Sequence, residues 1–268
     1  DVVVELLDAR IPAASANPML REIIGDKPRV VALNKRDLAD ENMTRRWLEH
    51  FRAKKIPAVA LDSVSGKGMK ELLTLIEREA KYRTERLVSK GVAARKARVM
   101  ILGIPNVGKS SLINRLAGAA KAKTADKPGV TRAKQWIRIG ADVDLLDTPG
   151  ILWPKFEDPR VGLKLAFTGA VNDEIYDLES VAHLLLATLR RDHQERLQER
   201  FKFKEALPET TEGLMDAIGR KRGCLLKGGR IDFEKVQHIL LAEFRMGKFG
   251  KISLDVPPTE VAEEVDDG

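Results

Sequence analysis

The sequence predicts an open, mostly parallel α/β sheet with helices on both faces, followed by an all-helical domain. Two observations lead to this fold class. Short β-rich runs alternate with helical patterns in the first part of the chain, and from about residue 173 helical spacing continues without a convincing strand. We therefore divide the chain into a sheet domain at 1–172, a helical domain at 173–251 and an acidic tail at 252–268.

Six strands are expected in the sheet domain. Several are nearly continuous apolar runs, as in strands that are buried on both faces. The β-rich runs lie at Val2–Leu7, Val30–Leu33, Ala58–Leu61, Val99–Leu102 and Val143–Leu146. The run Gln135–Ile139 alternates between apolar and polar residues, which is typical of an edge strand.

Helical spacing separates these strands and then fills the second domain. In the sheet domain it covers Asn42–Lys54, Met69–Tyr82 and Lys109–Leu116. In the helical domain it covers the stretches DLESVAHLLLATLRRDHQERLQERF, TTEGLMDAIGRKRG and DFEKVQHILLAEFRMGKF.

The composition is that of a globular protein with a core, since 43% of the 268 residues are hydrophobic. The longest uncharged runs, such as Val99–Gly108, are about half the roughly twenty residues that a membrane-spanning helix needs, so we expect no membrane span. The single cysteine, Cys224, excludes an internal disulfide and fits a reducing, cytoplasmic location. Because the chain opens at Asp1 directly in an apolar run, we expect a further segment to precede it.

The net charge of +7 is unevenly spread, because the acidic tail carries six acids and no Lys or Arg. The rest of the chain is therefore more basic than the whole, which predicts a polyanionic partner, nucleic acid before membrane. The alternative is that scattered lysines only keep the protein in solution. Basic runs at Lys81–Arg98 and Gly219–Arg230 would make binding to phosphates steeply dependent on salt. A solvated linker helix is the alternative for the first run.

The segment GIPNVGKSS at 103–111 matches the phosphate-binding pattern G-x-x-x-x-G-K-[ST]. It follows an expected strand and opens an expected helix, which is the context that the pattern requires. We expect the Lys109 ammonium to reach the β- and γ-phosphates and the Ser110 hydroxyl to bind Mg²⁺. The candidate ligands of the phosphates are Asn106, Val107, Gly108, Lys109, Ser110 and Ser111.

Two later segments fit the γ-phosphate side of the same site. DTPG at 147–150 follows a strand, which makes Asp147 a candidate for the Mg²⁺-side carboxylate and the Gly150 N–H a candidate γ-phosphate contact. Taken alone, DTPG is a common turn, but its place downstream of the phosphate loop favours the site. Between them, KPGVTR at 127–132 offers Thr131 as a threonine that closes on Mg²⁺ when the γ-phosphate is present.

NKRD at 34–37 has the pattern of a guanine-recognition loop, although a chance tetrapeptide is the alternative. It follows a buried strand, and open α/β sheets bind ligands at the carboxyl ends of their strands. The Asp37 carboxylate can accept hydrogen bonds from N1–H and the 2-amino group of guanine, a donor pair that adenine lacks. Asn34 would join loops, the Lys35 stem would cover the base, and Arg36 lies between them. The next strand ends in DSVSGKG, where Asp62 and Ser63 are candidate nucleotide-binding residues and the backbone N–H of Ser63 is the candidate contact for the guanine oxygen.

These motifs predict a guanine-nucleotide site whose elements appear in an unusual order: base loop, second base loop, phosphate loop, switch I, switch II. Chain order does not decide which loops meet, because neighbouring termini can be joined and the chain opened elsewhere. With LLDARIP at 6–12, LLDTPGILWPKFED at 145–158 and AIGRKRGCL at 217–225, the chain resembles the circularly permuted GTPases, specifically the YlqF/RbgA type, ribosome biogenesis GTPase A.

The resemblance covers essentially the whole chain and implies a permuted P-loop GTPase fold. It implies binding of GTP and GDP with magnesium, and hydrolysis coupled to late assembly of the large ribosomal subunit. The implied partners are the pre-ribosomal particle and its RNA, bound in part by a helical domain that resembles RNA-binding antiterminator folds. We expect a monomer with no membrane partner.

The chain departs from Ras-like GTPases at Ile151, which follows DTPG where those enzymes place a water-orienting glutamine. We therefore expect slow hydrolysis by the protein alone and assign no certain catalytic residue. Asn106 matches a position that binds K⁺ in potassium-stimulated relatives, and a simple loop hydrogen bond is the alternative.

A GTPase is the leading hypothesis for the function. A nucleotide-gated binding module is the second, and a phosphotransferase, against which NKRD argues, is the third.

Overall fold

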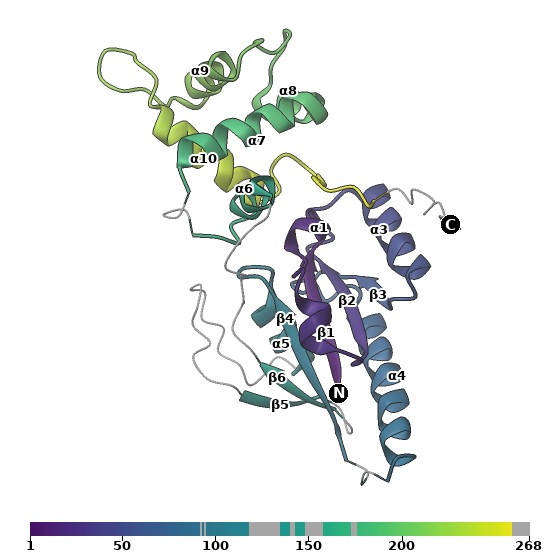
Figure 1. Cartoon of the computed structure of the whole chain (residues 1–268). Coiled ribbons are helices and arrows are strands. Elements are labelled where there is room, and N and C mark those ends of the chain that lie inside the picture. Colours follow the sequence, from purple (N-terminus) through teal and green to yellow (C-terminus); the bar gives the residue numbers. More distant parts are fainter. Residues whose placement is uncertain are drawn as a thin grey trace.

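The computed structural model describes residues 1–91, 93, 95–117, 135–139, 143–147, 158–172 and 176–258. Its centre is a six-stranded sheet with the strand order β3-β2-β1-β4-β6-β5 (Figure 1). The strands are β1 (Val2–Asp8), β2 (Arg29–Asn34), β3 (Ala58–Ala60), β4 (Ala97–Gly103), β5 (Gln135–Ile139) and β6 (Val143–Asp147). All six expected strands are present within a few residues of their predicted bounds.

The sheet is parallel except at one edge. β1 lies between β2 and β4, with Val4 beside Val30 on one side and beside Ile101 on the other. β5 pairs antiparallel with β6, so the alternating run is an edge strand, as predicted. Because β2, β1 and β4 are parallel neighbours, the loops that follow β2 and β4 leave the same edge of the sheet.

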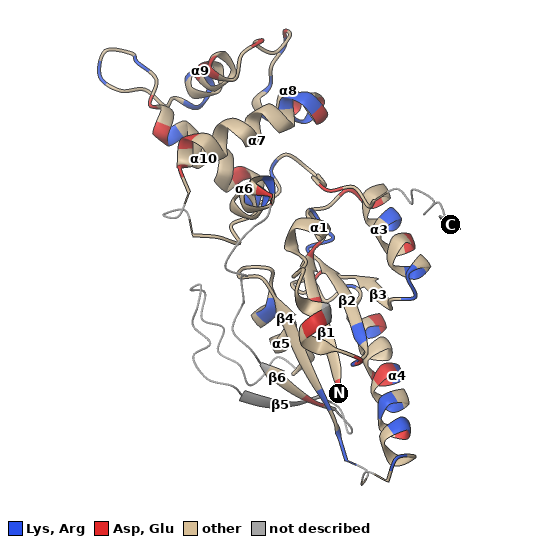
Figure 2. Cartoon of the chain, in the orientation of Figure 1, with Lys and Arg blue, Asp and Glu red and all other residues tan. Residues whose placement is uncertain are grey.

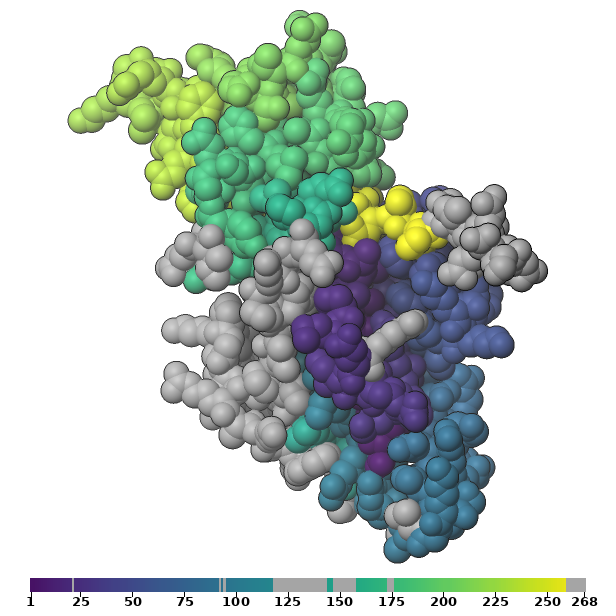
Figure 3. All heavy atoms as spheres, viewed as in Figure 1, coloured from purple at the N-terminus to yellow at the C-terminus, as the bar shows by residue number. Residues whose placement is uncertain are grey.

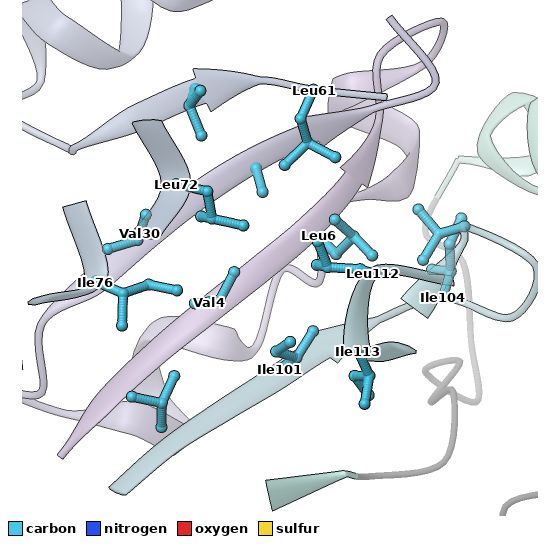
Figure 4. Packing of buried hydrophobic residues seen from close by; sticks show 14 of the residues in the cluster. Val4, Leu6, Val30, Leu61, Leu72, Ile76, Ile101, Ile104, Leu112 and Ile113 are labelled. Carbon is cyan, nitrogen blue, oxygen red and sulfur yellow. The ribbon is translucent and has the colours of Figure 1, made fainter. Parts of the chain in front are cut away.

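Helices cover both faces of the sheet, which confirms the predicted fold class. Alternate residues of β1 point to opposite faces, as the two-residue period of a strand requires. Val4 and Leu6 pack with residues of α4 (Met69–Val88) and α5 (Lys109–Leu116), including Leu72 and Leu112 (Figure 4). On the other face, Leu7 joins Trp47 of α3 (Glu41–Ala53) in a separate apolar cluster.

Three helices were not predicted from helical spacing. They are short, and the apolar repeat that marks a longer amphipathic helix has no room to appear in them. They are α1 (Pro12–Ser15), α2 (Leu20–Ile24) and α6 (Pro159–Phe167).

The remaining helices form a second body above the carboxyl edge of the sheet (Figure 1). They are α7 (Leu178–Asp192), α8 (Gln194–Phe201), α9 (Thr211–Arg222) and α10 (Phe233–Arg245). Their apolar residues form one cluster that includes Leu185, Ile218 and Leu240. α6 serves both bodies, since Leu165 belongs to the sheet cluster whereas Phe167 belongs to the helical cluster.

The segment expected to begin an acidic tail instead starts as an ordered strap. Residues 251–258, which we call the strap, follow α10 and run between the helical body and α1 and α3 (Figure 3). Ile252 is 1% exposed and Asp255 is 4% exposed. An expectation based on charge alone missed this packing because Asp255 is buried against specific partners.

Candidate functional site

The three loops that the sequence assigned to one site meet at Asn34. Its amide nitrogen donates to the carbonyl oxygen of Val107 at 2.7 Å and to the Ser63 hydroxyl at 3.1 Å. Its amide oxygen accepts from the Ser63 backbone N–H at 3.0 Å. Asn34 is 1% exposed, so these bonds are shielded from water. NKRD therefore lies against the phosphate loop, although the two are far apart in the chain.

The phosphate loop packs so closely against Asn34 that it requires glycine at 108. Gly108 has φ +98°, and a Cβ atom placed on it would lie 2.3 Å from Asn34 Nδ2. Asn106 also has positive φ, at 55°, and a non-glycine residue in that conformation commonly marks a ligand site.

The chemistry of the loop suits a polyphosphate. Gly108 caps the N-terminus of α5 without a side chain, and no acid lies in the first turn, so the helix end keeps its positive partial charge. Lys109 begins the helix and is 6% exposed, while Ser110 is exposed beside it. A buried ammonium, the N-terminal end of a helix and an exposed hydroxyl together fit phosphate oxygens and a magnesium ion.

Lys35 of the base loop is tied to a residue that the motif analysis did not assign. Its ammonium lies 3.2 Å from the carboxylate of Asp8, the last residue of β1. Asp8 also accepts two side-chain bonds from Arg10, at 3.0 and 2.8 Å. Burial acts to raise the pKa of Asp8, but Arg10 and Lys35 outweigh it, and the pKa of Asp8 lies well below its ordinary value. Asp8 is therefore a buried carboxylate anion that orients Lys35, whose φ is 60°.

The two remaining residues of the base loop have different surroundings. Asp37 is exposed at the edge of the sheet, where a ligand can reach it. Arg36 instead donates to the carbonyl oxygen of Ala60 at 3.2 Å. Its side chain lines a groove of about 830 Å³ between α3 and α4, over the edge strand β3. The Arg36 side chain is thus directed away from the phosphate loop.

The second base loop differs from the prediction in its detail. The Ser63 N–H, expected to meet the guanine oxygen, is already bonded to Asn34, and one N–H group cannot serve both partners fully. The next donors along the loop are the amides of Val64 and Ser65, which bond Asp62 Oδ1 at 2.8 and 3.2 Å. Ser63 helps to build the site through Asn34, while Asp62 shapes the turn that follows.

Asn106 makes the loop hydrogen bond that was one of its two expected roles. Its amide nitrogen donates to the carbonyl oxygen of Gly169 at 2.7 Å, which links the phosphate loop to the turn after α6. The bond uses Nδ2, whereas a cation would need the oxygen Oδ1, so the two roles are compatible.

The γ-phosphate side of the site lies outside the described residues. This applies to Thr131, Gly150 and Ile151 and to the side chain of Asp147. Within the described part of the chain, no group of three or more His, Cys, Asp or Glu residues is placed to hold a metal ion. None of the described helices combines the length and the hydropathy that a membrane span requires.

Comparisons with known proteins agree with this geometry. A family model for the 50S ribosome-binding GTPase matches residues 98–212. The match begins in β4, just before the phosphate loop, and omits the base loop, as expected if the base loop has moved to the front of the chain.

Several relatives cover nearly the whole chain. "Ribosome biogenesis GTPase A" of Bacillus cereus is 49% identical over 267 residues, which is 100% of this chain and 90% of that protein. "Mitochondrial ribosome-associated GTPase 1" of Mus musculus is 32% identical over 95% of this chain and 83% of that protein. Among solved structures, GNP-bound YlqF from T. maritima is 28% identical with a TM-score of 0.66, covering 96% of this chain and 92% of that one. The GDP-bound structure of TM YlqF has a TM-score of 0.68 at 27% identity, with 96% and 94% covered.

Proposed function

Because the chain belongs to the ribosome biogenesis GTPase A family, we propose that it binds GTP and hydrolyses it to GDP and phosphate in step with late assembly of the large ribosomal subunit. The observation that carries this proposal is the Asn34 junction, which places the base loop against the phosphate loop. A single guanine nucleotide would then bind with its base at Asp37 and its phosphates at α5.

The phosphate end of the proposed site is formed by the backbone of Asn106–Ser111 and the Lys109 ammonium. Magnesium would be held by Ser110, with Thr131 and Asp147 as further candidates. When bound, the ion neutralises charge on the β- and γ-phosphate oxygens. Gly150 is the proposed contact for the γ-phosphate.

The proposed recognition of guanine is tested by Asp37→Asn. The carboxylate accepts from N1–H and the 2-amino group of guanine, whereas xanthine carries a carbonyl in place of the amino group and needs a donor. We expect the variant to bind XTP more tightly than GTP, reversing the preference of the unaltered protein by about tenfold or more. Dissociation constants measured by calorimetry for both nucleotides provide the test. If the preference stays with GTP, Asp37 does not bind the base.

Hydrolysis by the protein alone is proposed to be slow, because Ile151 cannot hydrogen-bond the attacking water. Additional charge stabilisation would come from potassium at Asn106 or from the ribosomal particle. Comparing the rate of GTP turnover in K⁺ and in Na⁺ tests potassium, and equal rates would exclude a role for it.

Comparing the rate of GTP turnover with and without large ribosomal subunits tests the ribosomal particle. If subunits bind in a nucleotide-dependent way without raising turnover, the protein is a nucleotide-gated binding module, the alternative that Ile151 favours.

Ribosomal RNA is the proposed polyanionic partner. Lys and Arg recur along α4 and around α9 and the loop that follows it (Figure 2). In that loop Lys227 and Arg230 are exposed. Each phosphate contact that is removed should lower the slope of log affinity against log salt by roughly one. We expect the double variant Lys227→Ala, Arg230→Ala to reduce the salt dependence of binding to large-subunit RNA. An unchanged slope would exclude this loop as a contact. We propose that the protein is cytoplasmic and monomeric.

A further inference from the structure

The strap is bonded to the segment that continues the base loop. The Ile252 N–H donates to the carbonyl oxygen of Leu38 at 3.0 Å. The Asp40 N–H donates to the Ser253 hydroxyl at 3.2 Å, and Lys251 forms an ion pair with Glu41. Leu38 is the residue directly after Asp37, so the strap fixes the base loop at the end opposite to Asn34.

Asp255 anchors the strap at a junction of three helices. Its carboxylate accepts from the backbone N–H of Ala14 in α1 at 2.9 Å and forms an ion pair with Lys164 of α6. Its carbonyl oxygen accepts from Trp47 Nε1 of α3 at 3.3 Å. A buried carboxylate with a charged partner and two further bonds at the same residue holds the strap in one register.

The turn between β1 and α1 adds a second link between the strap and the base loop. The Leu254 N–H donates to the carbonyl oxygen of Arg10 at 2.7 Å. The guanidinium of Arg10 bonds Asp8, which in turn contacts Lys35 of the base loop, and it lies 5.5 Å from the ring centroid of Phe244 in α10. The same helix leads into the strap, so base loop, strap and α10 are joined in one set of contacts.

We propose that the strap holds the base loop in the conformation that recognises guanine, with Ser253 and Asp255 as positioning residues. This inference rests on the proposed function, because it assumes that Asp37 binds the base. Two sites that share one element are linked reciprocally: guanine binding tightens the docking of the strap, and undocking the strap weakens guanine binding by the same factor. A ribosomal partner that displaces the helical body and undocks the strap would therefore weaken binding of the guanine base.

The first test removes single strap contacts in the full chain. Ser253→Ala deletes the acceptor of the Asp40 N–H, and loss of one net hydrogen bond shifts the docking equilibrium of the strap by about three- to tenfold. We expect GDP to bind more weakly to Ser253→Ala, by up to about that factor, and more weakly again when Asp255→Asn is added. Ser89→Ala is the matched control, because Ser89 Oγ bonds Arg86 O at the far end of α4. Removing residues 259–268, which leaves the strap complete, should also leave GDP affinity unchanged.

The second test distinguishes positioning from general stability. Hydrogen exchange at the amides of Ile252 and Leu254 reports docking of the strap, since both donate to carbonyl oxygens of the sheet domain. We expect GDP to slow exchange at both amides in the unaltered protein. In Asp37→Asn, XDP should slow it and GDP should not, because only XDP matches the altered base site.

The outcomes of these tests separate the two proposals. If Asp37→Asn does not change the nucleotide preference, the proposed base site is wrong. If the preference does change but Ser253→Ala binds GDP like Ser89→Ala, or GDP leaves exchange of the strap amides unchanged, the base site stands and the strap does not position it.

Discussion

At the scale of the residue, the site depends on how little space lies between Asn34 and Gly108. Asn34 uses both ends of its amide to join three loops. That geometry brings its nitrogen to within 2.3 Å of where a Cβ atom on Gly108 would lie. The same glycine begins α5, so any side chain at 108 would disturb the loop junction and the phosphate loop together.

Gly108→Ala should therefore weaken nucleotide binding. The methyl group must displace the Asn34 amide, and the left-handed backbone at 108 adds strain of about 1–2 kcal/mol. We expect GDP affinity to fall by tenfold or more, as measured by calorimetry at about 1.4 kcal/mol per factor of ten. Gly223→Ala is a matched control, because Gly223 has φ +66° and nothing within 4 Å of an added Cβ. If the two variants bind GDP equally, the clash between residue 108 and Asn34 does not weaken nucleotide binding.

Individual residues also mark the limit of what motifs could predict. The P-loop pattern and NKRD have fixed spacing, and with them the sequence identified Asn34, Gly108 and Lys109 before the fold was known. Asp8 was not assigned a role, because a lone aspartate at a strand end has no spacing rule. Its role depends on β1 lying beside β2, which brings it to 3.2 Å from Lys35.

At the scale of the element, His193 divides one predicted helical stretch into α7 and α8. Its φ is −141° and ψ is 39°, and its N–H bonds Leu189 O at 2.8 Å as the last contact of α7. Burial is the main reason that the pKa of His193 lies below its ordinary value. Asp192 and Asp40 act in the opposite direction, and Arg196 adds to the lowering.

This lowered pKa predicts that stability falls as the solution becomes acidic. The unfolded chain takes up its proton near pH 6.5, whereas the folded chain resists protonation until lower pH, so protons favour unfolding below about pH 6.5. We expect His193→Gln, which stays neutral, to lose less unfolding free energy than the unaltered protein between pH 7.5 and 5.5. Urea titrations at the two pH values measure this difference.

A matched variant makes that test specific. His238→Gln lies at an exposed position of α10 and should keep the pH difference of the unaltered protein. If His193→Gln shows the same loss as His238→Gln, protonation at the corner between α7 and α8 does not destabilise the fold.

Elements held by distant partners were the ones that sequence patterns could not predict. α4 continues to Val88, beyond the predicted Tyr82, into the basic run. The strap has no periodic pattern, and its packing depends on Asp255 meeting Lys164 and Ala14. Such contacts appear only when the chain is folded, because the two partners lie 91 and 241 residues away in the sequence.

At the scale of the whole molecule, the rewired chain order leaves the sheet site intact. β2 and β4 flank β1, so the base loop and the phosphate loop emerge at one edge whichever comes first in the sequence. The family and fold were predictable because the motifs are local. The arrangement of the helical body was not, because it depends on contacts such as Arg245 Nη2 to the Ala166 carbonyl oxygen at 2.8 Å.

These connections predict that the two bodies unfold together. α6 places Leu165 in the sheet cluster and Phe167 in the helical cluster, and the strap ties α10 to α3. Each body carries a natural probe. Cys224, the single cysteine, is fully buried in the helical cluster, and Trp47 is buried against the sheet.

In urea, the reactivity of Cys224 and the emission of Trp47 should therefore change at one midpoint, measured in a chain with Trp136→Phe and Trp153→Phe. GDP at one hundred times its dissociation constant adds about 2.7 kcal/mol to the free energy of unfolding. Although the proposed nucleotide site belongs to the sheet domain, we expect GDP to move both midpoints equally. As a control for the two tryptophan substitutions, the reactivity of Cys224 is also measured in the unaltered chain. If the midpoint of Cys224 reactivity lies at lower urea than the midpoint of Trp47 emission, and GDP does not shift the Cys224 midpoint, the helical body unfolds independently. In that case α6 and the strap do not couple the two bodies.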